Sequence, residues 1–188
     1  MRFSAFFLLS FALFFAACRP AAAPVSVSEK PVSINNVPQA NPQLPMTKNI
    51  ESLGWTIFDG KREKIVDYKG KVVVLDFWAT YCPPCLEEIP HLVSLQNKYG
   101  SENFQIIGLH VGGEEDRPKV PAFVERLKMN YPLATPDDEL TNILFGGESA
   151  IPQTFVFDRD SRLVRKFIGY DAEIKDALNR TVELSLNQ

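Results

Sequence analysis

Runs of apolar residues divide the second half of the chain into alternating strands and helices. Residues 72–78 and 104–110 are continuous β-branched and aromatic runs. Runs of this length and composition are typical of strands that are buried on both faces of a sheet. The other predicted strands are residues 55–58, 154–157 and 163–167. Residues 158–161 indicate a hairpin between the last two strands, and Asp59-Gly60 indicates a turn after the first.

Helical spacing of apolar positions appears between these strands. In residues 84–99, Ile89, Leu92 and Leu95 fall near one face, which predicts a helix that packs against the sheet. Further helices are predicted at residues 118–129, 137–145 and 172–186. Strands that alternate with helices predict an α/β fold whose sheet is covered on both faces.

The first 50 residues follow a different pattern. Arg2 precedes an apolar run at residues 5–17, which is typical of a signal peptide and too short to span a bilayer. A buried core helix is the alternative. Residues 18–50 are rich in proline and show no helical or strand period, so they are interpreted as a linker. The folded domain is expected to occupy residues 51–188.

The chain has three cysteines, and Cys18 has no obvious partner once Cys82 and Cys85 are paired. Phe15-Ala16-Ala17-Cys18 resembles the lipobox of bacterial lipoproteins, in which the cysteine is lipidated and becomes the mature N-terminus. Ordinary cleavage within residues 21–23 is the alternative. The resemblance implies an exported lipoprotein that is anchored in the membrane and faces the periplasm or the cell exterior. The net charge of −3 gives no indication of a nucleic-acid partner.

The motif Cys82-Pro83-Pro84-Cys85 lies where a predicted buried strand passes into a helix. Two cysteines at this spacing can close a disulfide across one helical turn, and the first lies at the helix N-terminus. Free N–H groups and the helix dipole stabilise a thiolate there, so its pKa falls from about 8.5 toward about 3.5–7.5. Half of a zinc site is one alternative, although neither His91 nor His110 follows a zinc-finger spacing. A purely structural disulfide is the other.

Three segments carry a resemblance to a known family: residues 70–80, the Glu88-Ile89-Pro90 sequence after the second cysteine, and residues 151–155. From about Gly54 onward the chain resembles the thioredoxin superfamily, and within it the exported TlpA/ResA-type reductases, which include those of cytochrome c maturation. This resemblance implies a central mixed β-sheet with helices on both faces. It also implies reduction of disulfides in exported proteins, with electrons from a membrane thiol donor. The redox-active Cys82–Cys85 disulfide would act without any other cofactor or metal.

The resemblance also assigns roles to residues near the cysteines. Cys82 would be the nucleophile, exposed at the helix start, and Cys85 the resolving thiol one turn inside. Pro152 would form a cis peptide bond beside the sulfurs, and the backbone of Ile151 would pair with the substrate chain. Apart from the resemblance, the aromatic residues Trp78 and Tyr81 are expected to shield the sulfurs and contribute to substrate binding. Core and rim aromatics without a function are the alternative.

Asp76 matches the buried acid of thioredoxin and has apolar neighbours along its strand. A buried carboxyl has a raised pKa and can transfer a proton near neutral pH, so Asp76 is interpreted as the acid/base for Cys85. An exposed position at a sheet edge is the alternative. Glu88 either tunes the site or is a solvated helix residue. His91 and His110 are interpreted as structural.

Other functional classes remain as alternatives to a reductase. An exported oxidant or isomerase would use the same cysteines in the opposite direction. The copper-delivering Sco proteins share the fold, but they space their cysteines by three residues and add a distal histidine. Peroxiredoxins carry a Pro-x-x-x-Thr-x-x-Cys motif, which is missing before Cys82.

Overall fold

Two long apolar strands lie in the middle of a seven-stranded sheet in the computed structural model, which describes residues 53–188. Strands β3 (Val72–Trp78) and β4 (Phe104–His110) are parallel and buried along their whole length. Their bounds agree with the predicted strands. The strand order is β2-β1-β5-β4-β3-β6-β7. The other strands are β1 (Gly54–Ile57), β2 (Arg62–Lys64), β5 (Leu133–Pro136), β6 (Gln153–Phe157) and β7 (Leu163–Ile168).

The sheet is mixed, as expected from the resemblance. Strand β5 is parallel to β4, whereas β6 is antiparallel to β3 and β7 is antiparallel to β6. Strands β1 and β2 form an antiparallel hairpin that extends the sheet beyond β5. Because β3 and β6 run in opposite directions, the end of β3 lies beside the beginning of β6, and the segments before α1 and before β6 meet at one edge.

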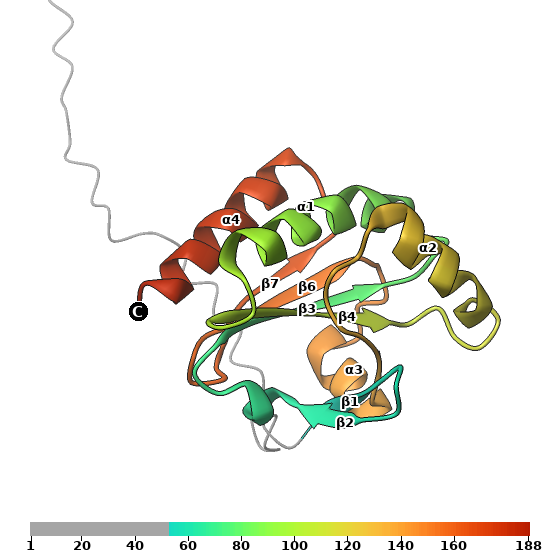
Figure 1. Ribbon diagram of the computed structural model, residues 1–188, viewed down its shortest axis with the longest axis horizontal. Coiled ribbons are helices and arrows are strands. Elements are labelled where there is room, and N and C mark those ends of the chain that lie inside the picture. Colours follow the sequence, from blue (N-terminus) through green and yellow to red (C-terminus); the bar gives the residue numbers. More distant parts are fainter. Residues whose placement is uncertain (1–52) are drawn as a thin grey trace, which may run out of the picture. The chain divides into compact units, whose positions relative to one another are not determined.

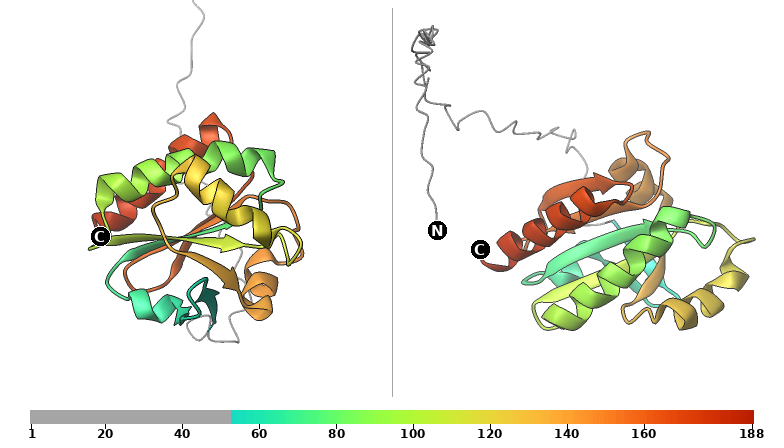
Figure 2. Two further views of the ribbon diagram at one scale, coloured as in Figure 1. Left: turned by 45° about the vertical axis from the view of Figure 1, so that its right-hand side comes forward. Right: turned by 90° about the horizontal axis from the view of Figure 1, so that it is seen from above.

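Helices cover both faces of the sheet (Figure 1). Helices α1 (Pro83–Tyr99), α2 (Val120–Leu127) and α4 (Ala172–Leu186) lie on one face, and α3 (Asp138–Phe145) lies on the other, as a second view confirms (Figure 2). Alternate residues of β3 supply the two cores. Val72 and Val74 pack in the cluster that includes residues of α1 and α4, whereas Leu75 and Phe77 pack in the cluster that includes α3.

The sequence pattern missed the short elements. Strands β2 and β5 and the 3₁₀ helix Ile65–Tyr68 were not predicted, because three or four residues are too few to show a period. The helix expected at residues 118–129 is divided into a 3₁₀ turn, Arg117–Lys119, and α2. Pro121 lacks the N–H group that an uninterrupted α-helix over residues 118–129 would need at that position.

The expected signal peptide, Cys18 and the whole of the proline-rich linker lie outside the described residues. None of the helices within residues 53–188 combines the length and the apolar character that a membrane span requires.

Candidate active site

The cysteine pair lies in the first turn of α1, immediately after β3. Cys82 is the N-cap residue, with extended backbone angles of φ −99° and ψ 101°, and Pro83 is the first helical residue. Cys82 and Cys85 form a disulfide, and their Cα atoms are 5.4 Å apart. The buried strand fixes where the helix begins, so the sulfurs are held at the edge of the sheet.

A single backbone donor reaches the sulfur of Cys82. The N–H group of Cys85 donates to Cys82 Sγ over 3.3 Å. An N-cap side chain ordinarily accepts from the second or third residue of the helix. Here the first two helical residues are Pro83 and Pro84, which have no N–H group. The helix N-terminus therefore stabilises negative charge on Cys82 less than a helix with an ordinary first turn would.

Apolar side chains surround both sulfurs. Cys85 is completely buried and Cys82 is only 5% exposed, so the expectation of an exposed Cys82 is wrong for the disulfide form. The reason is tertiary packing, because Trp78 lies in the same cluster and Ile151 packs against it. Tyr81, which precedes Cys82 in the sequence, differs from these residues because it is 63% exposed.

The loop before β6 brings Ile151 against the apolar cluster that contains the two cysteines. The Ile151–Pro152 peptide bond is cis, as expected from the resemblance. The carbonyl of Pro152 accepts from the N–H of Gly169 over 2.8 Å, which fixes the loop to the end of β7. Ile151 and Trp78 therefore pack with the cysteines, and Tyr81 precedes Cys82. A part of Trp78, Tyr81, Ile151 and Pro152 in substrate binding stays a prediction.

Two buried carboxyls lie under α1. Asp76 is 1% exposed on β3, and Glu88 is 1% exposed on α1. The hydroxyl of Thr154 donates to Glu88 Oε1 over 2.6 Å, and Thr154 is also the register partner of Asp76 on β6. Burial, followed by the charge of Glu88, raises the pKa of Asp76 well above its usual range. Burial also raises the pKa of Glu88, against the opposing hydrogen bond from Thr154.

The sequence left open whether Glu88 is buried or solvated, although the spacing of Glu88 along the helix indicates a buried position. Cys85, Glu88, Leu92 and Leu95 are spaced by three, four and three residues, and this spacing puts them on one helical face. All four are buried against the sheet. Glu88 therefore belongs to the candidate site, and the interpretation of Glu88 as a solvated residue is wrong.

A separate polar network holds the segment that precedes Cys82. Asp116 is 2% exposed, and it accepts from the backbone N–H of Thr80 over 2.8 Å and from the Thr80 hydroxyl. His110 Nε2 lies 3.0 Å from the same carboxylate, and Lys119 Nζ lies 3.2 Å away. Burial alone would raise the pKa of Asp116, but the hydrogen bonds from Thr80, His110 and Lys119 hold it well below its usual range. Sequence reasoning missed Asp116.

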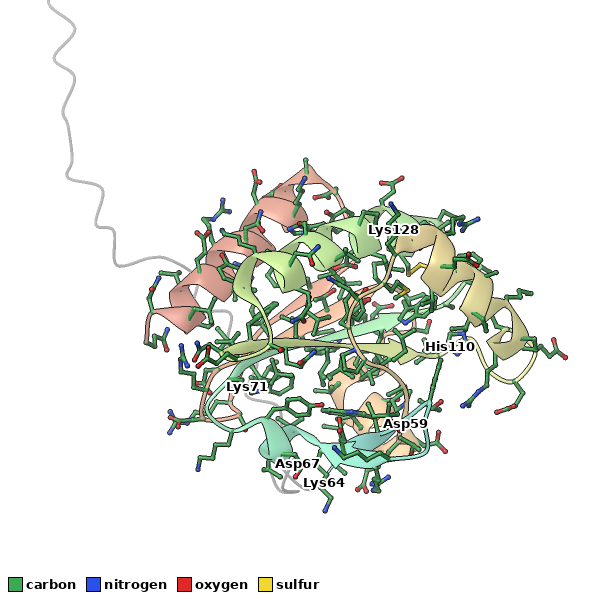
Figure 3. All side chains as sticks on the ribbon, in the orientation of Figure 1. Asp59, Lys64, Asp67, Lys71, His110 and Lys128 are labelled. Carbon is green, nitrogen blue, oxygen red and sulfur yellow. A yellow bond between two sulfur atoms is a disulfide. The ribbon has the colours of Figure 1, made fainter. Side chains whose placement is uncertain are left out.

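The histidines have polar partners, which agrees with the structural role expected for them. His110, the last residue of β4 and labelled in Figure 3, contacts Asp116 and packs edge-on against Trp78. His91 Nε2 lies 2.8 Å from Asn179 Oδ1. Burial lowers the pKa of His91 against that opposing hydrogen bond. Within residues 53–188, the side chains form no group of three or more His, Cys, Asp or Glu that could hold a metal ion.

Comparison with known proteins identifies the family. A thiol-disulfide oxidoreductase ResA of Bacillus cereus is 36% identical over 116 residues, which are 61% of this chain and 64% of that protein. ResA of Bacillus subtilis (strain 168) is 30% identical over 123 residues, which are 64% of this chain and 67% of that protein. The chain therefore spans about two thirds of the length of these relatives.

A solved structure agrees with these relatives. The thiol:disulfide interchange protein of the thioredoxin family from Chlorobium tepidum TLS is 28% identical, with a TM-score of 0.61, and the match covers 74% of this chain and 98% of that one. Residues 49–166, more than half of the chain, match the AhpC/TSA family. With its mixed sheet, its cysteine pair at the start of α1 and these relatives, the chain belongs to the AhpC/TSA family of thioredoxin-like proteins.

Proposed function

We propose that the chain is an exported thiol–disulfide reductase whose working residues are Cys82 and Cys85. The observation that carries this proposal is the position of Cys82 Sγ, at a helix N-cap with the N–H of Cys85 as its donor. The fold, the adjacent cis-proline loop and the names of the ResA relatives support it.

The reaction proceeds through two exchange steps. The Cys82 thiolate attacks a substrate disulfide and forms a mixed disulfide with one of its sulfurs. The substrate S–S bond breaks in this step. The other substrate sulfur leaves as a thiolate and takes up a proton. The Cys85 thiol then loses its proton and attacks Cys82 Sγ. The Cys82–Cys85 disulfide forms, and the second substrate thiolate leaves. The substrate gains two electrons and the protein loses two.

The buried carboxyls supply the base for the second step. Cys85 is completely buried, so bulk water does not reach its thiol directly. Glu88 lies three residues after Cys85 on α1, and Asp76 lies on β3, whose last residue, Trp78, packs in the same cluster as Cys85. Burial raises the pKa of Glu88 to about 7, and burial followed by the charge of Glu88 raises the pKa of Asp76 well above its usual range, so the pair can exchange a proton near neutral pH.

The proposed substrates are disulfide-bonded exported proteins, such as apocytochrome c or partners in oxidase assembly. Tyr81 offers an exposed aromatic surface beside Cys82, and Ile151 lies in the loop next to the sulfurs. An extended substrate chain that contacts these residues would bring its disulfide to Cys82. A membrane thiol protein is the proposed donor that returns electrons to the Cys82–Cys85 disulfide.

We expect a reduction potential near that of thioredoxin, which is about −270 mV. Strong oxidants of the same fold have a much higher potential, about −120 mV. The reason is that Pro83 and Pro84 remove two donors, so the reduced form is less stabilised. Equilibration with glutathione, followed by mass spectrometry of the trapped thiols, measures this potential. A Pro84→Ala variant restores an N–H group at the second helical position and should shift the potential upward. A wild-type value near −120 mV would favour the oxidant or isomerase alternative instead.

We further propose that the protein is anchored in the membrane through a lipid on Cys18. The support is the sequence Phe15-Ala16-Ala17-Cys18 after an apolar run. Cells given a labelled fatty acid should label the wild-type protein, whereas a Cys18→Ser variant should stay unlabelled and be released from membranes. Equal labelling and equal retention of the two proteins would show that Cys18 is not the anchor.

A further inference from the structure

A tyrosine that the proposed mechanism does not use lies under α1 with the two carboxyls. Tyr131 precedes β5 and is 6% exposed. It packs in the same apolar cluster as Val74 of β3 and Leu92 of α1. A phenol buried in this way ordinarily finds a hydrogen-bond partner for its hydroxyl group.

Gly108 shows how close Tyr131 lies to the site. Gly108 on β4 is the register partner of Asp76 on β3. A Cβ atom added at Gly108 would lie 3.1 Å from Tyr131 Cε2 and 3.2 Å from Trp78 Nε1. The tyrosine ring and the indole therefore converge over the residue that pairs with Asp76. On the other side of Asp76, Thr154 connects β6 to Glu88.

Five buried polar atoms of Asp76, Glu88, Trp78 and Tyr131 have no hydrogen-bond partner among the side chains and backbone that the structure describes. They are Asp76 Oδ1, Asp76 Oδ2, Glu88 Oε2, Trp78 Nε1 and the Tyr131 hydroxyl. Buried polar groups in proteins are nearly always satisfied, and ordered water is the usual partner where protein atoms do not reach. Two donors and two carboxyls give a water molecule the two to four polar contacts that it needs.

We propose that these atoms enclose a buried water site, and that Tyr131 is a positioning residue that donates through this water to the carboxyls of Asp76 and Glu88. A donor stabilises the charged form of a carboxyl, so the hydroxyl makes the pair a base at a lower pH than burial alone would permit. The role of Tyr131 rests on the reductase function proposed above, because it supports the step in which Cys85 loses its proton.

The surrounding charges are consistent with this role. Burial, followed by the charges of Asp76 and Glu88, raises the pKa of Tyr131 well above its usual value, so its hydroxyl stays protonated and can donate. Burial, followed by the charges of Glu88 and Glu87, raises the pKa of Tyr170 to about 12. The titratable groups around the pair are Cys85 and Glu87 on α1, His110 on β4 behind Trp78, Tyr131 before β5, and Tyr170 after β7.

The test is a carbon NMR titration of the side-chain carboxyls in the full-length reduced protein. In a Tyr131→Phe variant, the apparent pKa values of the Asp76–Glu88 pair should rise by about one unit, which is a tenfold change in proton affinity. Tyr68→Phe is the matched control, because its hydroxyl donates to Glu63 and not to the site. The control substitution should leave the apparent pKa values of the Asp76–Glu88 pair unchanged. Coincident titrations of the wild type and Tyr131→Phe would overturn the proposal.

A second variant keeps the test independent of folding. Site-specific 3-fluorotyrosine at position 131 keeps the shape and is a stronger donor, so the apparent pKa values should fall instead of rise. Mixed-disulfide resolution in Tyr131→Phe should slow about tenfold at pH 7 and recover by pH 9, in parallel with the shift. The titration needs no substrate, so a wild type without reductase activity would overturn the proposed function alone. If fluorotyrosine at position 131 leaves the apparent pKa values of the Asp76–Glu88 pair unchanged, the proposed role of Tyr131 is wrong.

Discussion

A Cys85→Ser variant should accumulate a stable mixed disulfide with its substrates. Cys82 keeps its place at the N-cap and still attacks, but the serine at position 85 cannot displace the substrate from the Cys82 sulfur. Turnover should fall by more than about 10³-fold, because the lost residue forms part of the covalent mechanism. Non-reducing gels and mass spectrometry of protein purified from cells would detect the adduct and identify the captured partners.

Matched variants separate this trapping from nonspecific reaction. Cys82→Ser and the double variant Cys82→Ser/Cys85→Ser should form no adduct, because the attacking sulfur is missing. A Cys18→Ser background keeps the third cysteine from contributing. If Cys82→Ser traps substrates and Cys85→Ser does not, the roles of the two cysteines are reversed and the proposed mechanism is wrong.

An Asp76→Asn variant should slow resolution of the mixed disulfide by about 10²-fold near neutral pH, at the lower end of general-base effects. The first attack by Cys82 should hardly change. The asparagine side chain would keep the shape of the carboxyl but could not accept the proton of Cys85. Removing the charge of Asp76 also relieves its repulsion of Glu88. Glu88 can then accept the Cys85 proton in some of the molecules. We therefore expect the rate of mixed-disulfide resolution to fall further in the double variant Asp76→Asn/Glu88→Gln than in either single variant.

The same substitution should stabilise the fold at neutral and alkaline pH. A carboxyl whose folded pKa is raised favours folding only while it is protonated, so its contribution is full below its unfolded pKa of about 4 and is lost as the pH rises through the raised folded value. Burial and Glu88 raise the pKa of Asp76 in this way. Asparagine removes the cost of burying the charge. Urea unfolding at pH 5 and pH 8 should show a gain for Asp76→Asn only at the higher pH.

Stopped-flow reduction of a peptide disulfide from pH 6 to pH 9 measures the two kinetic steps separately. The control is Asp67→Asn, which changes an aspartate of the 3₁₀ helix Ile65–Tyr68, outside the site. An Asp76→Asn variant with the wild-type resolution rate and the wild-type pH profile would show that Asp76 is only structural. A stability gain without a kinetic loss would lead to the same conclusion.

The sequence predicted those features that depend on local pattern. Strands β3 and β4 were placed correctly because an unbroken apolar run has few alternatives, and the helix that begins after Cys82 follows from apolar spacing. The buried position of Asp76 was expected because its neighbours along β3 are apolar.

Contacts between distant segments could not be predicted in this way. Asp116 holds Thr80 across 36 residues of sequence, and nothing near Asp116 indicates that partner. Cys82 is nearly buried in a cluster against which Ile151 packs from the loop before β6, a contact across about 70 residues of sequence. Glu88 was left open between a site residue and a solvated one, and no local pattern could show that Thr154 would satisfy one of its oxygens.

Electron transfer from Cys82 and Cys85 to a protein disulfide can be followed in a single-turnover exchange. Reduced full-length protein is mixed with a disulfide-bonded peptide from an exported protein, and oxidised protein is mixed with the same peptide in its dithiol form. Acid quenching and mass spectrometry then follow both mixtures to equilibrium. Both mixtures should end mainly as reduced peptide and the Cys82–Cys85 disulfide. An equilibrium with oxidised peptide and reduced protein would show that the cysteines do not act as a reductant of this disulfide.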